Sequence, residues 1–169
     1  VSHDHFDHLD KPSVMRLFKG NPQMKVFCGF GVGKLIQGWC PGIEVVEAGW
    51  YQQLDDGQLK ITFLPAQHWG KRSLNDGGQR LWGAFMLQGD GLSVYYGGDT
   101  GYSNHFVEIP ELFGEPDYAL LGIGAYKPRW FMQPNHISPY DTLTASEEMR
   151  ARVTIPMHYG TFDLSDEPL

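Results

Sequence analysis

Short apolar runs separated by turn residues recur along this chain, and their lengths are typical of β-strands. Runs of strand length occupy residues 25–28, 44–47, 59–64, 82–88, 92–96 and 153 onward. The pair at 82–88 and 92–96 flanks Gly89-Asp90-Gly91, which predicts a β-hairpin. The strands at 44–47 and 59–64 are expected to flank a turn at Asp55-Asp56-Gly57.

Helix signals fall between several of these strands. Pro12 opens a short helix that ends near residue 18, because proline favours the first helical turn. Glycines within 29–34 permit a tight turn into a helix that ends near residue 39. Ser138 and Asp141, with Pro139 between them, predict a capped helix from residue 138 to about 152. Strands that alternate with helices indicate an α/β sandwich.

The composition is that of one compact domain. The chain has 169 residues, of which 41% are hydrophobic and 20% charged. A net charge of −7 argues against a nucleic-acid partner and against adsorption to anionic lipid. No run reaches the roughly 18 apolar residues of a membrane span, although peripheral lipid contact stays open. Four basic residues remain candidates to contact a phosphate: Lys71, Arg72, Lys127 and Arg129.

Cys28 and Cys40 are the two cysteines of the chain, and their spacing fits no C-x-x-C metal motif. We interpret them as free thiols, as is typical of intracellular proteins, which favours the cytoplasm without fixing the localisation. The chain starts at Val1 with no initiator methionine, so a targeting segment would lie upstream.

Histidines are concentrated at the start of the chain, in the pattern H-x-H-x-D-H. Residues i and i+2 of an extended segment point the same way, so His3 and His5 can bind one ion. Asp7 and His8, on the following turn, can face a second ion. Imidazole and carboxylate ligands together suit zinc or a similar divalent ion.

Three later segments each place one further ligand type just after a predicted strand. His68 follows the strand at 59–64, Asp99 follows the strand at 92–96, and His158 follows the strand that begins at 153. Loops at the ends of strands can converge on one site. With the opening motif they form a set of seven, enough for two metal ions that share one carboxylate.

The order H-x-H-x-D-H, His, Asp, His resembles the metallo-β-lactamase superfamily of dinuclear hydrolases. A narrower similarity, from residue 65 almost to the end, is to the phospholipases D that hydrolyse N-acylphosphatidylethanolamines and to their bacterial relatives. It is carried by the strings PAQHWGKRSLND, LWGAF, GGDTGY, IGAYKPRWFMQPNHISP and MHYGTFDLSDEP.

The resemblance implies which of the seven residues would bind each of two metal ions. His3, His5 and His68 would hold the first ion. Asp7, His8 and His158 would hold the second, and Asp99 would bridge the two.

The resemblance also implies an αββα sandwich of the metallo-β-lactamase type. In that family a β-rich region precedes the H-x-H-x-D-H loop. We therefore expect residues 1–169 to be a single metallo-hydrolase domain that lacks this region, as the C-terminal portion of a longer chain.

The expected reaction is hydrolysis by a hydroxide that bridges two divalent ions, most simply Zn²⁺, and attacks a phosphodiester. Asp7, Asp99 and His136 are the expected catalytic residues. His136 matches a histidine that lines the site of the phospholipase-type enzymes outside the metal set, and it is suited to assist the leaving group. The alternative is a structural histidine near the start of the helix at 138.

Residues 126–132 are aromatic and basic, and they precede His136. Arg129 is expected to bind a phosphate, with Tyr126 and Trp130 as further substrate-binding residues. Core packing is the alternative for the apolar residues at 130–132. Trp69 is expected to support His68.

Two further polar residues, His105 and Asp4, are not used by the motif. His105 has no motif around it and is interpreted as a surface residue. Asp4 is expected to be exposed or to hydrogen-bond a ligand histidine rather than coordinate a metal.

The substrate is expected to be a small-molecule or lipid phosphodiester, and two other functions stay open. The same centre can hydrolyse a lactone or another carboxylic ester or amide. A metal-binding module without catalysis is the second alternative, and the oligomeric state is not predicted.

Overall fold

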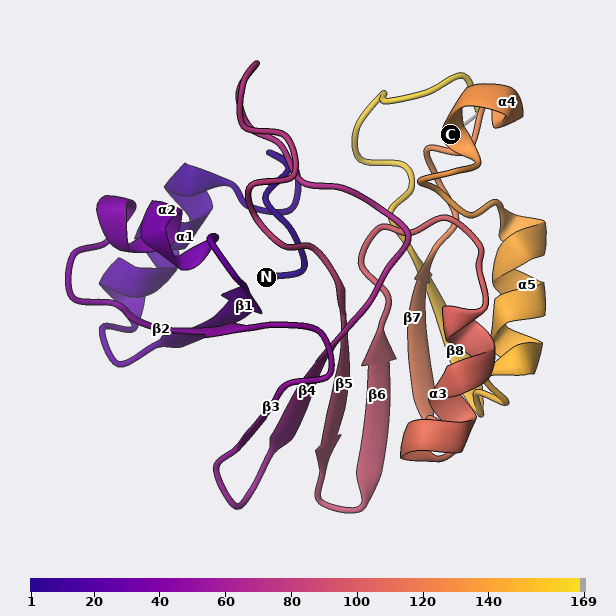
Figure 1. Cartoon of the computed structure of the whole chain (residues 1–169), viewed down its shortest axis with the longest axis horizontal. Helices are drawn as coiled ribbons and strands as arrows, with labels where there is room; N and C mark the ends of the chain where they lie inside the picture. The colour runs from indigo at the N-terminus through magenta and orange to yellow at the C-terminus, as the bar shows by residue number, and fades with distance from the viewer. Residues whose placement is uncertain (168–169) are drawn as a thin grey trace.

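The computed structural model describes residues 1–167, which form eight strands and five helices (Figure 1). The first half contains α1 (Lys11–Gly20), β1 (Lys25–Gly29), α2 (Gly33–Trp39), β2 (Glu44–Ala48), β3 (Gln53–Asp55) and β4 (Lys60–Leu64). The second half contains β5 (Ala84–Gly89), β6 (Leu92–Tyr96), α3 (His105–Phe113), β7 (Tyr118–Gly122), α4 (Arg129–Met132), α5 (Pro139–Glu148) and β8 (Val153–Met157). The strands form a parallel pair, β1-β2, and a six-stranded sheet in the order β3-β4-β5-β6-β7-β8.

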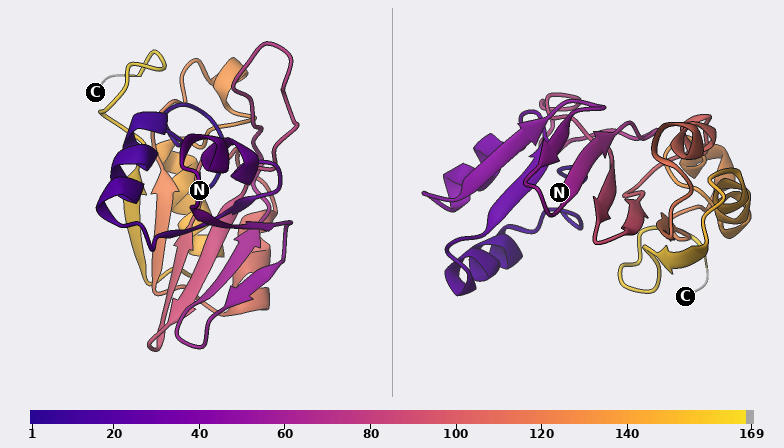
Figure 2. Two further views of the ribbon diagram at one scale, coloured as in Figure 1. Left: turned by 90° about the vertical axis from the view of Figure 1, so that its left-hand side faces the viewer. Right: turned by 90° about the horizontal axis from the view of Figure 1, so that it is seen from below.

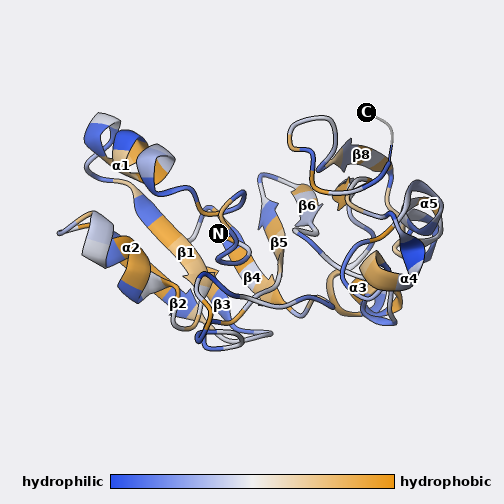
Figure 3. Ribbon diagram, turned by 90° about the horizontal axis from the view of Figure 1, so that it is seen from above, coloured by the Kyte–Doolittle hydropathy of each residue, from blue (hydrophilic) through white to orange (hydrophobic). Residues whose placement is uncertain are grey.

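The elements stack in four layers, which Figures 2 and 3 show from three sides. Apolar side chains of α1 and α2 pack on β1-β2, with Cys28, Val32 and Ile36 fully buried among them. The two sheets meet face to face, where the Phe27 and Phe85 rings lie 5.9 Å apart. Helices α3 and α5 cover the other face of the large sheet. This arrangement is the αββα sandwich that the family resemblance implies.

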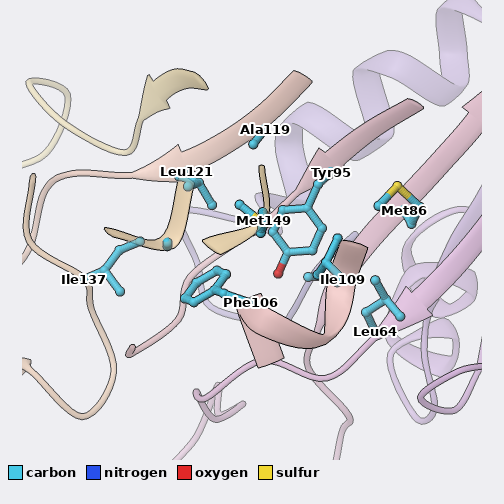
Figure 4. Close-up of a cluster of buried hydrophobic side chains, with 11 residues drawn as sticks. Leu64, Met86, Tyr95, Phe106, Ile109, Ala119, Leu121, Ile137 and Met149 are labelled. Carbon is cyan, nitrogen blue, oxygen red and sulfur yellow. The ribbon is translucent and has the colours of Figure 1, made fainter. Parts of the chain in front are cut away.

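The largest buried cluster lies between the large sheet and its two helices (Figure 4). Tyr95 of β6 and Phe106 of α3 meet at 6.4 Å between ring centroids, and Met149 closes the cluster after α5. All three side chains are fully buried. Burial of this apolar area, worth about 25 cal/mol per Å², holds α3 and α5 against the strands.

Strand direction decides where the loops with ligand residues lie. Strands β3 to β6 pair antiparallel, whereas β6, β7 and β8 pair parallel. As a result β4, β6, β7 and β8 all end at the same edge of the sheet. Loops that follow these strands therefore gather at one end of the molecule, next to the chain's first residues (Figure 1).

One face of the large sheet is covered over only part of its width. The β1-β2 pair covers β4 and β5 there, through residues such as Phe63 and Phe85. On the same face of β7 and β8, Tyr118, Val153 and Ile155 are 37–43% exposed. Within residues 1–167 this region is an exposed apolar sheet surface.

Helix caps form where the sequence predicts them. Asp10 caps α1 by accepting the Ser13 N–H at 2.9 Å, with a proline in the first turn. Ser138 and Asp141 cap α5 reciprocally, as a capping box does. Helix α5 ends at Glu148, four residues before its predicted end, and β8 begins at Val153.

Several elements differ from the predictions. The strands at 44–47 and 59–64 lie in different sheets, because β2 pairs with β1 and the turn at 55–57 joins β3 to β4. Strands β3 and β7 and helices α3 and α4 were not predicted. None of the helices in residues 1–167 combines the length and the apolar character that crossing a bilayer requires.

Candidate metal centre

Seven ligand-type side chains meet at the edge where β4, β6 and β8 end. His3, His5, Asp7 and His8 come from the loop before α1. His68, Asp99 and His158 follow β4, β6 and β8, respectively. Their ligand atoms fall into two groups of four, with Asp99 in both, and the atoms of each group lie within 4.8 Å of one another.

The first group consists of three imidazoles and one carboxylate. His5 Nδ1 lies 3.0 Å from His3 Nε2 and 3.3 Å from His68 Nε2. Asp99 Oδ2 lies 3.9 Å from the Nε2 atoms of both His3 and His68. His3, His68 and Asp99 are buried, so this group faces the interior of the protein.

The second group consists of two imidazoles and two carboxylates. His8 Nε2 lies 3.3 Å from Asp7 Oδ2 and 3.2 Å from Asp99 Oδ2. His158 Nε2 lies 3.5 Å and 3.3 Å from the same two oxygens. Asp7 is exposed, so this group faces solvent.

Both groups have the ligand types and spacing that a divalent metal ion such as zinc requires. Ligand atoms 2.0–2.1 Å from a tetrahedral ion lie about 3.3 Å apart, and most of the distances above are close to that value. Several polar atoms at the centre are buried without a hydrogen-bond partner within residues 1–167: His5 Nε2, His8 Nε2, Asp99 Oδ1 and His158 Nδ1. Buried polar atoms without partners are costly, and ion coordination would involve several of these residues.

In the second group, the contacts between histidines and carboxylates favour the charged form of each side chain. Burial opposes protonation of His8, but its contacts with Asp7 and Asp99 outweigh that effect and raise its pKa to about 9. The pKa of His158 is raised against the effect of burial by its contact with Asp7. Burial opposes ionisation of Asp99, yet its close contact with His8 lowers the net pKa of this carboxyl.

The first group behaves in the opposite way. Burial lowers the pKa of His68 to about 3, and it lowers the pKa of His3 well below the usual value. Burial also lowers the pKa of His5. These three imidazoles are neutral at neutral pH, which is the form that binds metal.

His136 lies beside the two groups without belonging to either. Its Nδ1 is 3.8 Å from Asp99 Oδ2, and its ring stacks on that of His158 at 5.7 Å. The main chain before α5 holds it in place, since its N–H donates to the Met132 carbonyl at 2.9 Å. Burial lowers the pKa of His136, so the ring is neutral at neutral pH.

A cavity of about 490 Å³ opens beside the second group. Asp7, His8 and His158 form its inner wall, and Tyr126 contributes to its lining. Apolar side chains complete it, among them Ile123, Met157, Phe162 and Leu164. Its outer wall is the segment after β8, where Glu167 accepts N–H bonds from Ala125 and Lys127.

The residues predicted to bind substrate lie in different surroundings. Arg129 Nη2 is 2.9 Å from Asp141, in the α5 cap, and its Nη1 donates to the His136 carbonyl. Trp130 is 82% exposed on α4, and Phe131 is 63% exposed, so core packing is excluded for both. Of the predicted substrate-binding residues, Tyr126 is the one that lines the cavity.

Three other expectations are corrected. His105 was expected at the surface but is buried at the start of α3, because its Nδ1 hydrogen-bonds Ser103 at 2.6 Å and its ring packs on Phe106. Asp4 was expected to be exposed or to bond a histidine, yet it is fully buried in an ion pair with Arg80. Arg72 donates to main-chain carbonyls and is not free to contact a phosphate.

Two smaller expectations concern Trp69 and the cysteines. The Trp69 ring lies 4.4 Å from that of His5 and 6.0 Å from that of His68, so it packs closer to His5 than to its predicted neighbour. Cys28 and Cys40 are buried and free, as expected.

Known proteins resemble this chain over nearly its whole length. It is 39% identical to N-acyl-phosphatidylethanolamine-hydrolyzing phospholipase D 1 of Caenorhabditis elegans, over 97% of this chain and 49% of that protein. It is 37% identical to the mitochondrial enzyme of that name from Saccharomyces cerevisiae, over 99% of this chain and 37% of the yeast protein. The chain thus spans about half the length, or less, of these relatives.

The structure agrees with the sequence comparison. Igni18, described as a novel metallo hydrolase from Ignicoccus hospitalis, superposes with a TM-score of 0.74 and 26% identity, over 96% of this chain and 63% of that one. YhfI of Bacillus subtilis, a metallo-beta-lactamase fold protein, superposes with a TM-score of 0.70 over 96% of this chain and 66% of that one; at 18% identity it shows the fold alone. The family model for the beta-lactamase superfamily domain matches residues 1–159. The chain therefore belongs to the beta-lactamase superfamily and has the metallo-β-lactamase fold.

Proposed function

We propose that this protein is a dinuclear, zinc-dependent phosphodiesterase of the phospholipase D type, and that residues 1–169 form a single metallo-hydrolase domain. The observation that carries the proposal is the pair of four-ligand groups that share Asp99, with His136 beside both. The names of the similar phospholipases D support the substrate class.

Each ligand has a role in this proposal. His3, His5 and His68 would hold one ion, and Asp7, His8 and His158 would hold the other. Asp99 would serve both ions, because its Oδ2 lies 3.9 Å from His3 Nε2 in the first group and 3.2 Å from His8 Nε2 in the second. When bound, the two ions supply Lewis acidity that activates water and polarises a phosphoryl oxygen.

His136 supplies the acid–base chemistry. Its ring is close enough to Asp99 to reach a substrate placed between the two groups and the cavity. Because burial keeps the imidazole neutral, it can donate one hydrogen bond to a phosphoryl or leaving-group oxygen. Asp99 lies within 4 Å of Nδ1, and its negative charge favours proton uptake by the ring during turnover.

The cavity supports a phosphodiester with an apolar substituent. It adjoins Asp7, His8 and His158, so the phosphate end of a ligand would lie at the second group. Tyr126, Met157 and Phe162 offer apolar surface to the rest of it. Arg129, paired with Asp141, would act on substrate through the position of His136 rather than by binding phosphate in its present geometry.

A comparison of substrate classes tests the proposal. The zinc-loaded full chain is assayed with bis(4-nitrophenyl) phosphate, with N-acylphosphatidylethanolamine in mixed micelles, with a lactone and with a β-lactam. The Asp99→Asn variant, purified in parallel, measures contaminating activity. We expect phosphodiester cleavage well above that background. Turnover of the lactone with no phosphodiester cleavage would replace the proposal by the carbonyl alternative, and no turnover with both ions bound would favour a binding module.

A further inference from the structure

The loop that carries four of the candidate ligands is tied to a second segment by buried charges. This segment, residues 70–80, follows His68, and we call it the 70–80 loop. Its ends are close together, since Gly78 N–H donates to the Gly70 carbonyl at 2.9 Å. The 70–80 loop thus closely follows one candidate ligand, His68, and packs against the loop that carries His3, His5, Asp7 and His8.

Asp4 stands between His3 and His5 but lies outside both groups of candidate ligands. Its side chain is fully buried and pairs with the Arg80 guanidinium through Nε. Its second oxygen, Oδ1, has no hydrogen-bond partner within residues 1–167. Arg80 is therefore the partner that compensates the buried charge of Asp4.

Arg80 is held in turn by Asp76. Its Nη2 pairs with Asp76 Oδ2, and the guanidinium side chain is only 10% exposed. The other oxygen of Asp76 accepts the main-chain N–H groups of Arg72 and Ser73, at 3.0 and 2.7 Å. Asp76 thus fixes both the conformation of the 70–80 loop and the direction of Arg80.

Arg72 completes the connection from the same loop. Its Nη1 donates to the carbonyls of Asp4 and Leu9, at 2.8 Å each. Those carbonyls flank residues 5–8, so a single guanidinium joins the two ends of the turn that presents His5, Asp7 and His8. The guanidinium also lies over the Phe6 ring, 4.1 Å from its centroid.

Close packing leaves this arrangement little freedom. A Cβ at Gly70 would lie 2.7 Å from Asp4 Oδ1 and 2.9 Å from the Arg80 carbonyl. Only glycine therefore lets the backbone approach the buried carboxylate so closely.

We propose that Asp4, Arg72, Asp76 and Arg80 form a positioning clamp that holds the ligand loop, residues 3–8, in its metal-binding conformation before any ion arrives. These are positioning residues, because they reach the candidate ligands through the main chain and do not touch the site themselves. The inference rests on the metal centre of the proposed function. Groups that orient metal ligands typically contribute about 10- to 100-fold to metal affinity.

Zinc affinity of metal-free full chain, measured by competition with a chromogenic chelator, tests the clamp. We expect Arg80→Met to weaken zinc binding about 10- to 100-fold. Arg80→Lys keeps the charge but cannot reach both Asp4 and Asp76, so its loss should be smaller. Arg152→Met is the matched control, since its Nη1 lies 3.9 Å from Asp117 and its side chain is 81% exposed. It should bind zinc as the parent does.

Arg80→Met leaves the buried Asp4 carboxylate without a counter-charge, and this variant can fail to fold. A double variant in which both residues are neutral keeps the test decisive. The Asp4→Asn/Arg80→Met variant removes both charges at once. The two residues act through one contact. The fold-loss of zinc affinity in the double variant should therefore equal the fold-loss in a folded single variant, Asp4→Asn or Arg80→Met, and not the product of the two single losses. Parent-like zinc affinity in folded Asp4→Asn/Arg80→Met would overturn the clamp.

Hydrogen exchange in the metal-free protein separates positioning from general stability. The Leu9 amide donates to the His5 carbonyl at 2.8 Å and reports on the ligand loop. In the double variant it should exchange faster, while amides of β5 and β6 keep their parent protection. Equal loss of protection in both regions would reduce the clamp to a structural ion pair. A parent chain that binds no zinc would instead contradict the proposed function.

Discussion

Asp99 belongs to both groups of candidate ligands, and its burial makes each of its contacts matter. It follows β6 in the turn 97–101, where Gly98 adopts a positive φ of 59°. A Cβ at Gly98 would lie 2.9 Å from that of Ser2, so glycine lets this turn approach the start of the ligand loop. At the residue scale the site depends on this close contact between two segments distant in sequence.

Asp99→Asn tests the shared carboxylate. The amide keeps the shape of the side chain but removes the negative charge that offsets two cations. We expect turnover to fall below detection while the circular dichroism spectrum stays that of the parent, and bound zinc to drop. Near-parent activity with both ions retained would remove Asp99 from the bridging position.

His136→Ala separates a chemical role from a ligand role. If the imidazole assists the leaving group, turnover should fall about 10²–10⁴-fold with both ions still bound. The loss should be smaller for aryl phosphodiesters, because an aryl oxide needs little proton donation. His158→Ala should instead lose zinc first. Equal loss of zinc in both variants would place His136 among the ligands.

Acid sensitivity of the metal-free chain should depend on His105. Burial lowers its pKa from 6.5 to about 4, so the folded state resists a proton that the unfolded state accepts. Stability from this group is complete above pH 6.5 and is lost as pH falls towards 4, by about 2 kcal/mol at pH 5. In urea unfolding, the free energy of unfolding of His105→Gln should rise relative to that of the parent as pH falls from 7.5 to 5. A constant difference across that range would contradict the shift.

At the scale of elements, β6 connects the core to the site. One face of the strand buries Tyr95 beneath α3, and its carboxyl end leads to Asp99. The Tyr95 hydroxyl is buried and has no hydrogen-bond partner within residues 1–167, which costs free energy. The core around it is otherwise apolar (Figure 4).

Tyr95→Phe should therefore stabilise the protein. Removal of the unpartnered hydroxyl leaves the ring packing intact, and we expect a gain of about 1 kcal/mol in the free energy of unfolding. Tyr118→Phe is the matched control, because Tyr118 is 37% exposed and its change should be close to zero. Destabilisation by Tyr95→Phe alone would mean that the hydroxyl has a bonded partner, such as an ordered water.

Local signals were sufficient for some elements and not for others. The hairpin β5-β6 and the α5 cap were predictable because turn glycines and the Ser138–Asp141 pair act over a few residues. Helix α3 was missed because Pro110, a residue that usually ends helices, lies in its interior. Strand β7 was also missed, although it is as long as β1. The partner of β2 could not be read from the sequence, because pairing with β1 is set by packing between layers.

Some residues of the site could likewise be predicted from the sequence, and others could not. All seven candidate ligands could be named from the sequence, because a dense motif and three strand ends limit where such residues lie. The Asp4–Arg80 pair could not, since 76 residues separate its members and Arg80 lies in a polar, glycine-rich stretch. The burial of His105 was missed for a similar reason, because its partners Ser103 and Phe106 carry no motif.

At the scale of the whole molecule, the four layers converge on one edge of the large sheet. The ligand loop enters from the side of β1-β2, and three loops of the large sheet supply the rest (Figure 1). The chain spans about half the length, or less, of the phospholipases D that it resembles. The seven candidate ligands nevertheless all lie within residues 1–158, so metal binding can be measured on this chain.

Zinc stoichiometry tests the dinuclear site most directly. The full chain is loaded with excess zinc, freed of unbound metal and analysed by inductively coupled plasma mass spectrometry. We predict two zinc ions per chain, and affinity that falls as pH drops, because protonated ligands cannot bind. His105→Gln should also hold two ions, since His105 belongs to neither group. One ion per chain at saturation, or none, would contradict a centre built on two groups that share Asp99.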